Sequence, residues 1–178
     1  WLWRGRTVKL VDGTGLSMPD TKENQARYPQ PSSQALGVGF PMARLVLVTC
    51  LATGAVLEAA IGPLGGKGSG ELSLVRPLLA RFSRGDVVLA DALYCNYFLI
   101  AALMSAGVDV LMEQNGSRIT DFECGQSLGA RDHVVRWPKP ILVASAAAVL
   151  VGAVFVPTYR VNYDDRAYQP SDAPAKQG

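Results

Sequence analysis

The chain has 178 residues, of which 49% are hydrophobic and 18% are charged, and its formal net charge is +2 at pH 7. A chain of this length buries one core of ordinary size and is too short for two full domains. The small positive charge permits a polyanionic partner but is too weak to argue for one.

Three cysteines, Cys50, Cys95 and Cys124, are widely spaced and odd in number. This pattern supports neither a disulfide framework nor a zinc knuckle, so we expect reduced thiols and a cytoplasmic protein. The chain starts at Trp1, inside a patterned segment and without a charged and then apolar leader. We therefore expect no secretory signal and a sequence that is a fragment.

The first predicted elements are three strands. In residues 7–14 (TVKLVDGT), Val8, Leu10 and Asp12 share one face with the period of two that indicates a strand, and Gly-Thr-Gly then predicts a turn. Residues 40–54 predict a second strand closed by a Thr-Gly turn, and residues 55–64 predict a third. The three strands are expected to form an antiparallel meander.

Helices and strands alternate in the next part of the chain. Residues 69–85 predict a helix with Ser69 or Ser73 as its cap, a late start or kink at Pro77, and an end at Gly85. A strand at 86–91, a helix at about 95–106 and a strand at 108–114 follow. This order predicts an α/β fold in which the last two strands are parallel.

The predicted topology brings Asp12 and Asp91 together. If the strand that ends at Asp91 pairs with the first strand, the two carboxylates lie on neighbouring strands just under about 5 Å apart, where they repel one another. A divalent cation would relieve that repulsion, and oxygen ligands suit Mg²⁺ or Mn²⁺ acting on phosphodiesters. Taken singly, Asp12 also fits a turn residue and Asp91 a helix N-cap.

The sequence itself resembles one family over residues 1 to about 140. The resemblance is carried by residues 11–79, from VDGTGLSMPD to LSLVRPLL, and by the stretches GDVVLADALYCNYFLIAAL and LGARDHVVRWPKP. These resemble transposases of the insertion-sequence-4 family, bacterial DDE transposases with a ribonuclease H-like catalytic domain. The resemblance implies an α/β, ribonuclease H-like mixed sheet: a three-strand antiparallel meander plus two parallel strands, with flanking helices, incomplete at the C-terminus.

The resemblance also implies what the two aspartates do. Asp12 in LVDGTG matches the family's first metal-binding acid, and Asp91 in LADALYCNYF matches the second. Both would be catalytic and would hold Mg²⁺ or Mn²⁺ for nicking and strand transfer at transposon ends. The implied partner is DNA, both transposon ends and target, and such transposases generally act as dimers, which implies a homodimer.

The polar, proline-bearing loop at residues 20–34 is a candidate DNA contact. We expect Lys22 and Arg27 to contact phosphates and Tyr28 to stack on a base, with a merely solvated loop as the alternative. The hydroxyls of Thr14 and Ser17 lie beside the first acid and favour local hydrogen bonds over metal or DNA contacts.

Two departures from the family pattern concern the site. Ala92 follows the second acid where relatives commonly carry Arg, which removes a cation near the metal. No helix after Asp91 shows the Tyr, Arg, Glu, Lys signature that carries the family's third acid. Glu113 is the best substitute among the other acids, whereas Glu71 is explained by the helix dipole and His133 by a structural role.

The character of the sequence changes after WPKP at 137–140. Residues 141–156 are unbroken apolar sequence, followed by a polar tail, so we expect 1–140 to be a partial transposase domain with the start of an insertion region. Residues 141–178 are expected to be non-family sequence, left by a frameshift or deletion. The apolar run is shorter than the roughly 20 residues of a membrane span, so we expect no membrane partner.

The missing third acid predicts a chain without full activity, because catalytic groups that act as a unit fail together. The alternative function is a non-catalytic remnant that binds DNA or pairs with an intact transposase. A third alternative is a membrane-tethered or unfolded remnant. The basic residues that would serve DNA binding are Arg4, Arg6, Lys9, Arg118, Arg131, Arg136 and Lys139.

Overall fold

The computed structural model describes residues 2–116, 118, 120, 125–129 and 132–137, and the backbone of residues 158–162. The chain divides into two compact units, Trp1–Gly116 and Ser117–Gly178. The apolar run at 141–156 and the basic residues Arg131 and Lys139 lie outside the described residues.

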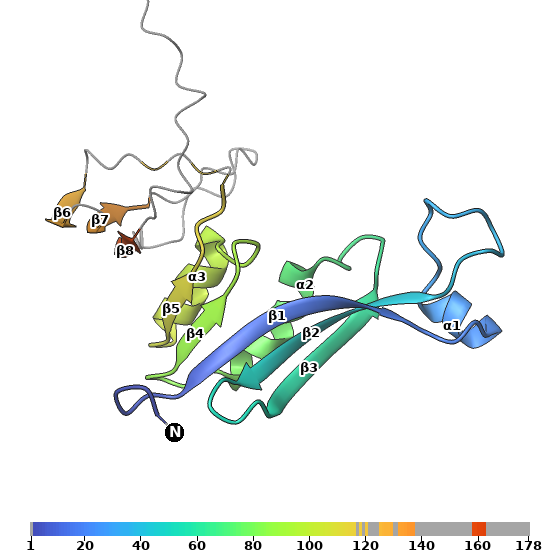
Figure 1. Cartoon of the computed structure of the whole chain (residues 1–178), viewed down its shortest axis with the longest axis horizontal. Coiled ribbons are helices and arrows are strands. Elements are labelled where there is room, and N and C mark those ends of the chain that lie inside the picture. The colour runs from blue at the N-terminus through green and yellow to red at the C-terminus, as the bar shows by residue number, and fades with distance from the viewer. Residues whose placement is uncertain are drawn as a thin grey trace, which may run out of the picture. The chain divides into compact units, whose positions relative to one another are not determined.

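The first unit is built on a five-stranded sheet in the order β3-β2-β1-β4-β5 (Figure 1). β1 pairs antiparallel with β2, and β2 with β3, whereas β4 pairs parallel with both β1 and β5. The predicted meander and parallel pair are therefore confirmed. The strands are β1 (Val8–Ser17), β2 (Met42–Cys50), β3 (Val56–Pro63), β4 (Val87–Ala90) and β5 (Asp109–Met112).

The turn predicted after Asp12 is wrong. β1 continues through Gly13 to Ser17, and this continuation pairs with β2 as far as Ser17 opposite Met42. The β2 ladder satisfies the backbone groups of the Gly-Thr-Gly segment, so those residues need no turn. Asp12 thus lies within β1, at a position that pairs with Leu47 of β2.

The helices differ in detail from those expected. Pro77 divides the predicted helix into α2 and a 3₁₀ helix, η1, and the cap is Gly70 without a side-chain bond rather than Ser69 or Ser73. The loop at 20–34 contains a short helix, α1, capped by the Thr21 hydroxyl. The helices are α1 (Lys22–Arg27), α2 (Glu71–Val75), η1 (Arg76–Arg81) and α3 (Tyr97–Ser105).

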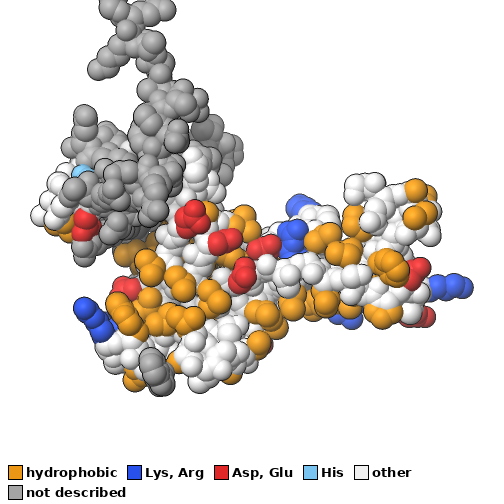
Figure 2. Space-filling model, viewed as in Figure 1, with side chains coloured by type: hydrophobic (Ala, Val, Ile, Leu, Met, Phe, Trp, Pro, Cys, Tyr) orange, Lys and Arg blue, Asp and Glu red, His pale blue; other side chains and the backbone are white. Residues whose placement is uncertain are grey.

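One face of the sheet carries the core. Alternate residues of β1, β2 and β4, such as Val11, Val48 and Val88, pack against apolar residues of α2, η1 and α3 in one cluster. The opposite face carries a row formed by Leu10, Leu89 and Leu111 on adjacent strands, and Leu111 is 64% exposed. Figure 2 shows hydrophobic side chains gathered on this face with acidic side chains beside them.

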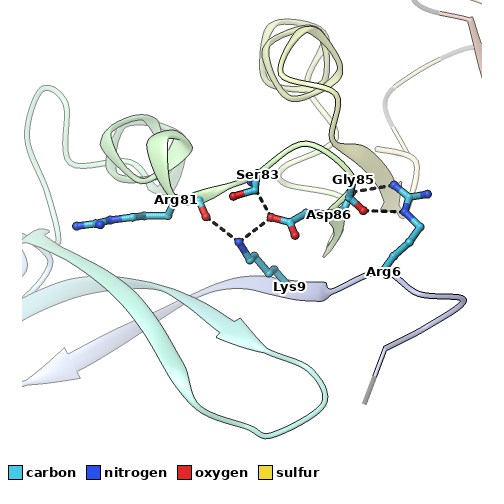
Figure 3. A network of polar contacts seen from close by, with 6 residues as sticks. All are labelled: Arg6, Lys9, Arg81, Ser83, Gly85 and Asp86. Carbon is cyan, nitrogen blue, oxygen red and sulfur yellow. Dashed lines mark hydrogen bonds and ion pairs between the residues drawn. The ribbon is translucent and has the colours of Figure 1, made fainter.

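A buried ion pair ties β1 to the segment before β4 (Figure 3). Lys9 Nζ lies 2.6 Å from Asp86 Oδ2 and donates to the Arg81 carbonyl at 2.7 Å. The Ser83 N–H donates to the same Asp86 oxygen at 2.7 Å. Arg6 donates to the carbonyls of Gly85 and Asp86. The Lys9 ammonium is therefore buried in contacts within the protein, and the expectation that it contacts DNA is wrong.

The second unit contains an antiparallel sheet in the order β6-β7-β8. Its strands are β6 (Gln126–Gly129), β7 (Asp132–Arg136) and β8 (Thr158–Asn162), and His133 lies in β7. Across the described parts of both units, no helix has the length and apolar character needed to cross a membrane.

Candidate functional site

The candidate site lies where the ladder between β1 and β4 ends. Val11 and Ala90 are the last partners in that parallel register, and both are buried in the core. The next residue on each chain is an aspartate, Asp12 and Asp91, and both are exposed. Asp12 continues β1 on the face opposite the core, and Asp91 follows the last residue of β4, so the two aspartates lie near one another where strands about 5 Å apart end their pairing. The structure therefore brings the two predicted residues together.

Backbone hydrogen bonds orient both carboxylates. Asp12 Oδ1 accepts the Gly13 N–H at 2.8 Å, and Asp91 Oδ1 accepts the Leu93 N–H at 2.9 Å. Asp91 is not the cap of α3, since Asn96 accepts the N–H groups of Phe98 and Leu99. An ionised carboxylate has about four acceptor sites, so each keeps capacity for a cation. This donor set fits Mg²⁺ or Mn²⁺, which take oxygen ligands from one or two carboxylates.

A third carboxylate approaches from the core side. A Cβ atom added to Gly13 would lie only 2.3 Å from Glu71 Cδ, so the Glu71 side chain occupies the space that glycine leaves. Glu71 Oε2 accepts the Tyr94 hydroxyl at 3.0 Å, and Glu71 Oε1 lies 4.0 Å from Arg44 Nε. The dipole interpretation of Glu71 missed these contacts. The glycine directly after Asp12 was the sequence signal that could have indicated them.

Tyr94 lies near Glu71, Asp12 and Asp91. Its side chain is fully buried. Burial is the main cause of its raised pKa, and the hydrogen bond and charge of Glu71, with the charges of Asp12 and Asp91, raise it further. The phenol therefore stays protonated and remains a hydrogen-bond donor at neutral pH.

Glu113 is a further acid, directly after the end of β5. Ala90 pairs with Met112, so Glu113 follows on β5 as Asp91 follows on β4. It is exposed. No set of three or more histidine, cysteine, aspartate or glutamate side chains among the described residues is grouped to hold a metal. The geometry that is present is thus an aspartate in β1 next to an aspartate that directly follows β4.

The expected DNA contacts lie on and beside α1. Lys22 and Arg27 are exposed, which agrees with contacts to phosphates. Tyr28 is 7% exposed, with the Arg27 guanidinium 5.4 Å from its ring centre. A ring so buried has no free face for a base, so its burial contradicts the expected stacking. Thr14 and Ser17 are exposed on β1.

The contact between Gly13 and Glu71 gives a testable prediction. Gly13→Ala is expected to displace the Glu71 carboxylate and break its bond to Tyr94, lowering the free energy of unfolding by about 1–2 kcal/mol in urea. Gly15→Ala is the matched control, because its Cβ would meet only Met42 Cε at 3.7 Å. Equal stability changes in the two variants would contradict the assigned contact.

Comparisons with known proteins bear on this geometry. The family model described as "Transposase DDE domain" matches residues 3–135. Part of the chain is also similar to transport proteins of mycobacteria. Identity is 41% over 85 residues to the probable transport protein MmpL4 of Mycobacterium leprae, covering 44% of this chain. It is 56% over 92 residues to the siderophore exporter MmpL5 of Mycobacterium tuberculosis, covering 52%. Each match spans 9% of the transport protein.

Proposed function

Since this chain belongs to the family of transposase DDE domains, we propose that Asp12 and Asp91 bind the divalent metal with which such domains act on DNA. Membership assigns the chain to DNA transposition and implies interaction with DNA. Its mixed five-stranded sheet with flanking helices agrees with the ribonuclease H-like fold of a transposase domain.

The proposal rests on one observation, the matched register of β1 and β4. Each aspartate stands one residue beyond the buried pair Val11 and Ala90, Asp12 within β1 and Asp91 just after the end of the adjacent parallel strand β4. A metal bound there would supply activation of an attacking hydroxyl and stabilisation of the departing oxygen of a phosphodiester. Asp12 and Asp91 would hold the ion, and the backbone bonds from Gly13 and Leu93 would fix the direction of each carboxylate.

Four finer assignments belong to the same proposal. We place the chain in the insertion-sequence-4 group because the sequences around Asp12 and Asp91, LVDGTG and LADALYCNYF, resemble that group's motifs. We assign Mg²⁺ or Mn²⁺ as the metal, because the available ligands are carboxylate oxygens. The chain acts on DNA in the cytoplasm, and as a homodimer on paired transposon ends.

Cleavage by this 178-residue chain alone is proposed to be weak. The resemblance implies three acids, and the described residues bring two of them to the same edge of the sheet. Loss of one member of a catalytic set usually removes most of the rate. The alternative function is a non-catalytic domain that binds DNA or pairs with an intact transposase.

Nicking of supercoiled plasmid in Mg²⁺ tests the proposal. The chain is expected to nick slowly and only with divalent metal, and Asp12→Ala is expected to remove that activity. Nicking that survives Asp12→Ala would refute the metal site. DNA binding by the wild-type chain with no nicking at all would instead support the non-catalytic alternative.

DNA binding through α1 is tested by its salt dependence. Replacing Lys22 and Arg27 by glutamine is expected to reduce the slope of log K against log salt by about 2, since each phosphate contact contributes roughly 0.9. Lys67→Gln, an exposed lysine between β3 and α2, is the control and should leave the slope unchanged. An unchanged slope in the double variant would place the DNA contacts elsewhere.

We also propose that residues 1–140 form the transposase part and 141–178 a segment of other origin. The family match ends at residue 135, and similarity to transport proteins covers a quarter to half of the chain. The end of the family match supports a boundary near residue 140, whereas the matches to transport proteins, of 45 to 92 residues, are longer than residues 141–178 and extend into the transposase part. Removing residues 141–178 is expected to leave DNA binding by the first unit unchanged, and loss of binding would contradict the division.

A further inference from the structure

The connection that carries Asp91 leaves the sheet without a strand partner. The ladder of β4 with β1 stops at Ala90, and residues 91–96 turn into α3. Within this turn, the Tyr94 N–H donates to the Asp91 carbonyl at 3.2 Å. β1, in contrast, continues beyond Asp12 along β2. The spacing of the two aspartates therefore depends on whatever fixes the turn to β1.

Tyr94 fixes the turn to β1 from the core face of the sheet. Its ring lies fully buried in the core cluster, so the direction of its hydroxyl is set by packing. The hydroxyl donates to Glu71 Oε2 at 3.0 Å. The Glu71 carboxylate in turn fills the space above Gly13, the residue directly after Asp12. Tyr94 and Glu71 thus link the turn of Asp91 to the strand of Asp12.

We propose that Tyr94 is a positioning residue for the metal site, holding the Asp91 turn against β1 through its hydrogen bond to Glu71. The inference rests on the proposed function of the two aspartates. Two neighbouring carboxylates repel one another when no cation lies between them. A fixed turn prevents them from separating, so both remain in place for the ion.

Arg44 contacts the second oxygen of the Glu71 carboxylate. Its Nε lies 4.0 Å from Glu71 Oε1, and its Nη1 donates to the Ser69 carbonyl at 3.5 Å. Glu71 is therefore held between a cation on β2 and the phenol of Tyr94. These contacts orient the Glu71 carboxylate toward Tyr94.

The test is the affinity of the full chain for Mn²⁺ alone, measured by titration calorimetry with Tyr94→Phe. This change removes the hydroxyl and keeps the buried ring. We expect affinity to fall about 10-fold, the lower end of the effect of residues that orient metal ligands. Tyr97→Phe is the matched control, another buried tyrosine three residues along, and should bind Mn²⁺ like the wild type.

Glu71→Ala removes the same bond from its other end. If both residues act through one contact, Tyr94→Phe added to Glu71→Ala is expected to cause no further loss of affinity. Glu71→Ala alone also tests the inference if Tyr94→Phe does not fold, because it removes the same hydrogen bond. Wild-type affinity in Tyr94→Phe, an equal loss in Tyr97→Phe, or additive losses in the double variant would each overturn the inference.

Asp12→Asn separates this inference from the proposed function. If Asp12→Asn loses Mn²⁺ binding while Tyr94→Phe retains it, the metal site stands and the role of Tyr94 is wrong. If Asp12→Asn binds Mn²⁺ like the wild type, the metal site fails, and the role of Tyr94 fails with it.

Discussion

Asp86→Ala is expected to lower the free energy of unfolding by about 3–5 kcal/mol, the usual effect of leaving one member of a buried ion pair without its partner. The side chains of Lys9 and Asp86 are only 10% and 9% exposed, so water cannot replace the lost carboxylate. The Ser83 N–H would lose its acceptor as well. Folded domains are stable by about 5–15 kcal/mol, so urea denaturation should show a much lower midpoint.

An exposed ion pair on the same side of the fold provides the control. Arg81 Nε lies 2.6 Å from Glu58 Oε2, but these side chains are 63% and 30% exposed. Glu58→Ala should therefore cost no more than about 1 kcal/mol. Replacing Lys9 with Met and Asp86 with Leu together removes both charges and should recover much of the loss. Similar losses for Asp86→Ala and Glu58→Ala would contradict the account of the buried pair.

Asp12→Asn and Asp91→Asn are each expected to weaken Mn²⁺ binding by about 100-fold. Residues that only orient metal ligands contribute roughly 10–100-fold, so loss of a ligand itself should reach the upper value. At a concentration 100 times the wild-type dissociation constant, Mn²⁺ stabilises the folded chain by about 2.7 kcal/mol, and a 100-fold weaker variant retains about 0.4 kcal/mol. Urea denaturation with and without Mn²⁺ measures both quantities.

The same variants should have the opposite effect without metal. Removing one of two neighbouring negative charges relieves repulsion, so the metal-free variants should be at least as stable as the wild type. Asp20→Asn is the control, an exposed aspartate before α1 whose Oδ1 accepts the Gln25 amide at 2.8 Å. Retained Mn²⁺ stabilisation in either site variant, or its loss in Asp20→Asn, would argue against the shared site.

Much of the sheet could be predicted because its signals are local. Alternation predicted the strand β1, and the strand, helix and strand from β4 to β5 predicted the parallel pair. That β4 also pairs with β1, and so brings Asp91 near Asp12, was only a condition of the prediction, and the structure fulfils it. The exact extent of β1 could not be predicted. Gly-Thr-Gly indicates a turn by itself, and only pairing with β2 keeps it extended to Ser17.

The surroundings of the site depend on contacts between distant residues. Glu71 is far from Asp12 in the sequence, and its approach requires both the absent side chain of Gly13 and the hydroxyl of Tyr94. Neither partner is apparent from the pattern around Glu71 itself. The burial of Tyr28 is likewise set by packing, which the sequence of a polar loop does not reveal. The loop therefore suggested a ring that is exposed and free to stack on a base.

The central claim is that Asp12 and Asp91 share one divalent ion. Anomalous diffraction from crystals of the chain grown with Mn²⁺ tests it most directly. The account predicts a single strong peak between the two side chains, about 2.1 Å from an oxygen of each carboxylate. A peak bound by only one of them, or no peak at this edge of the sheet, would contradict it.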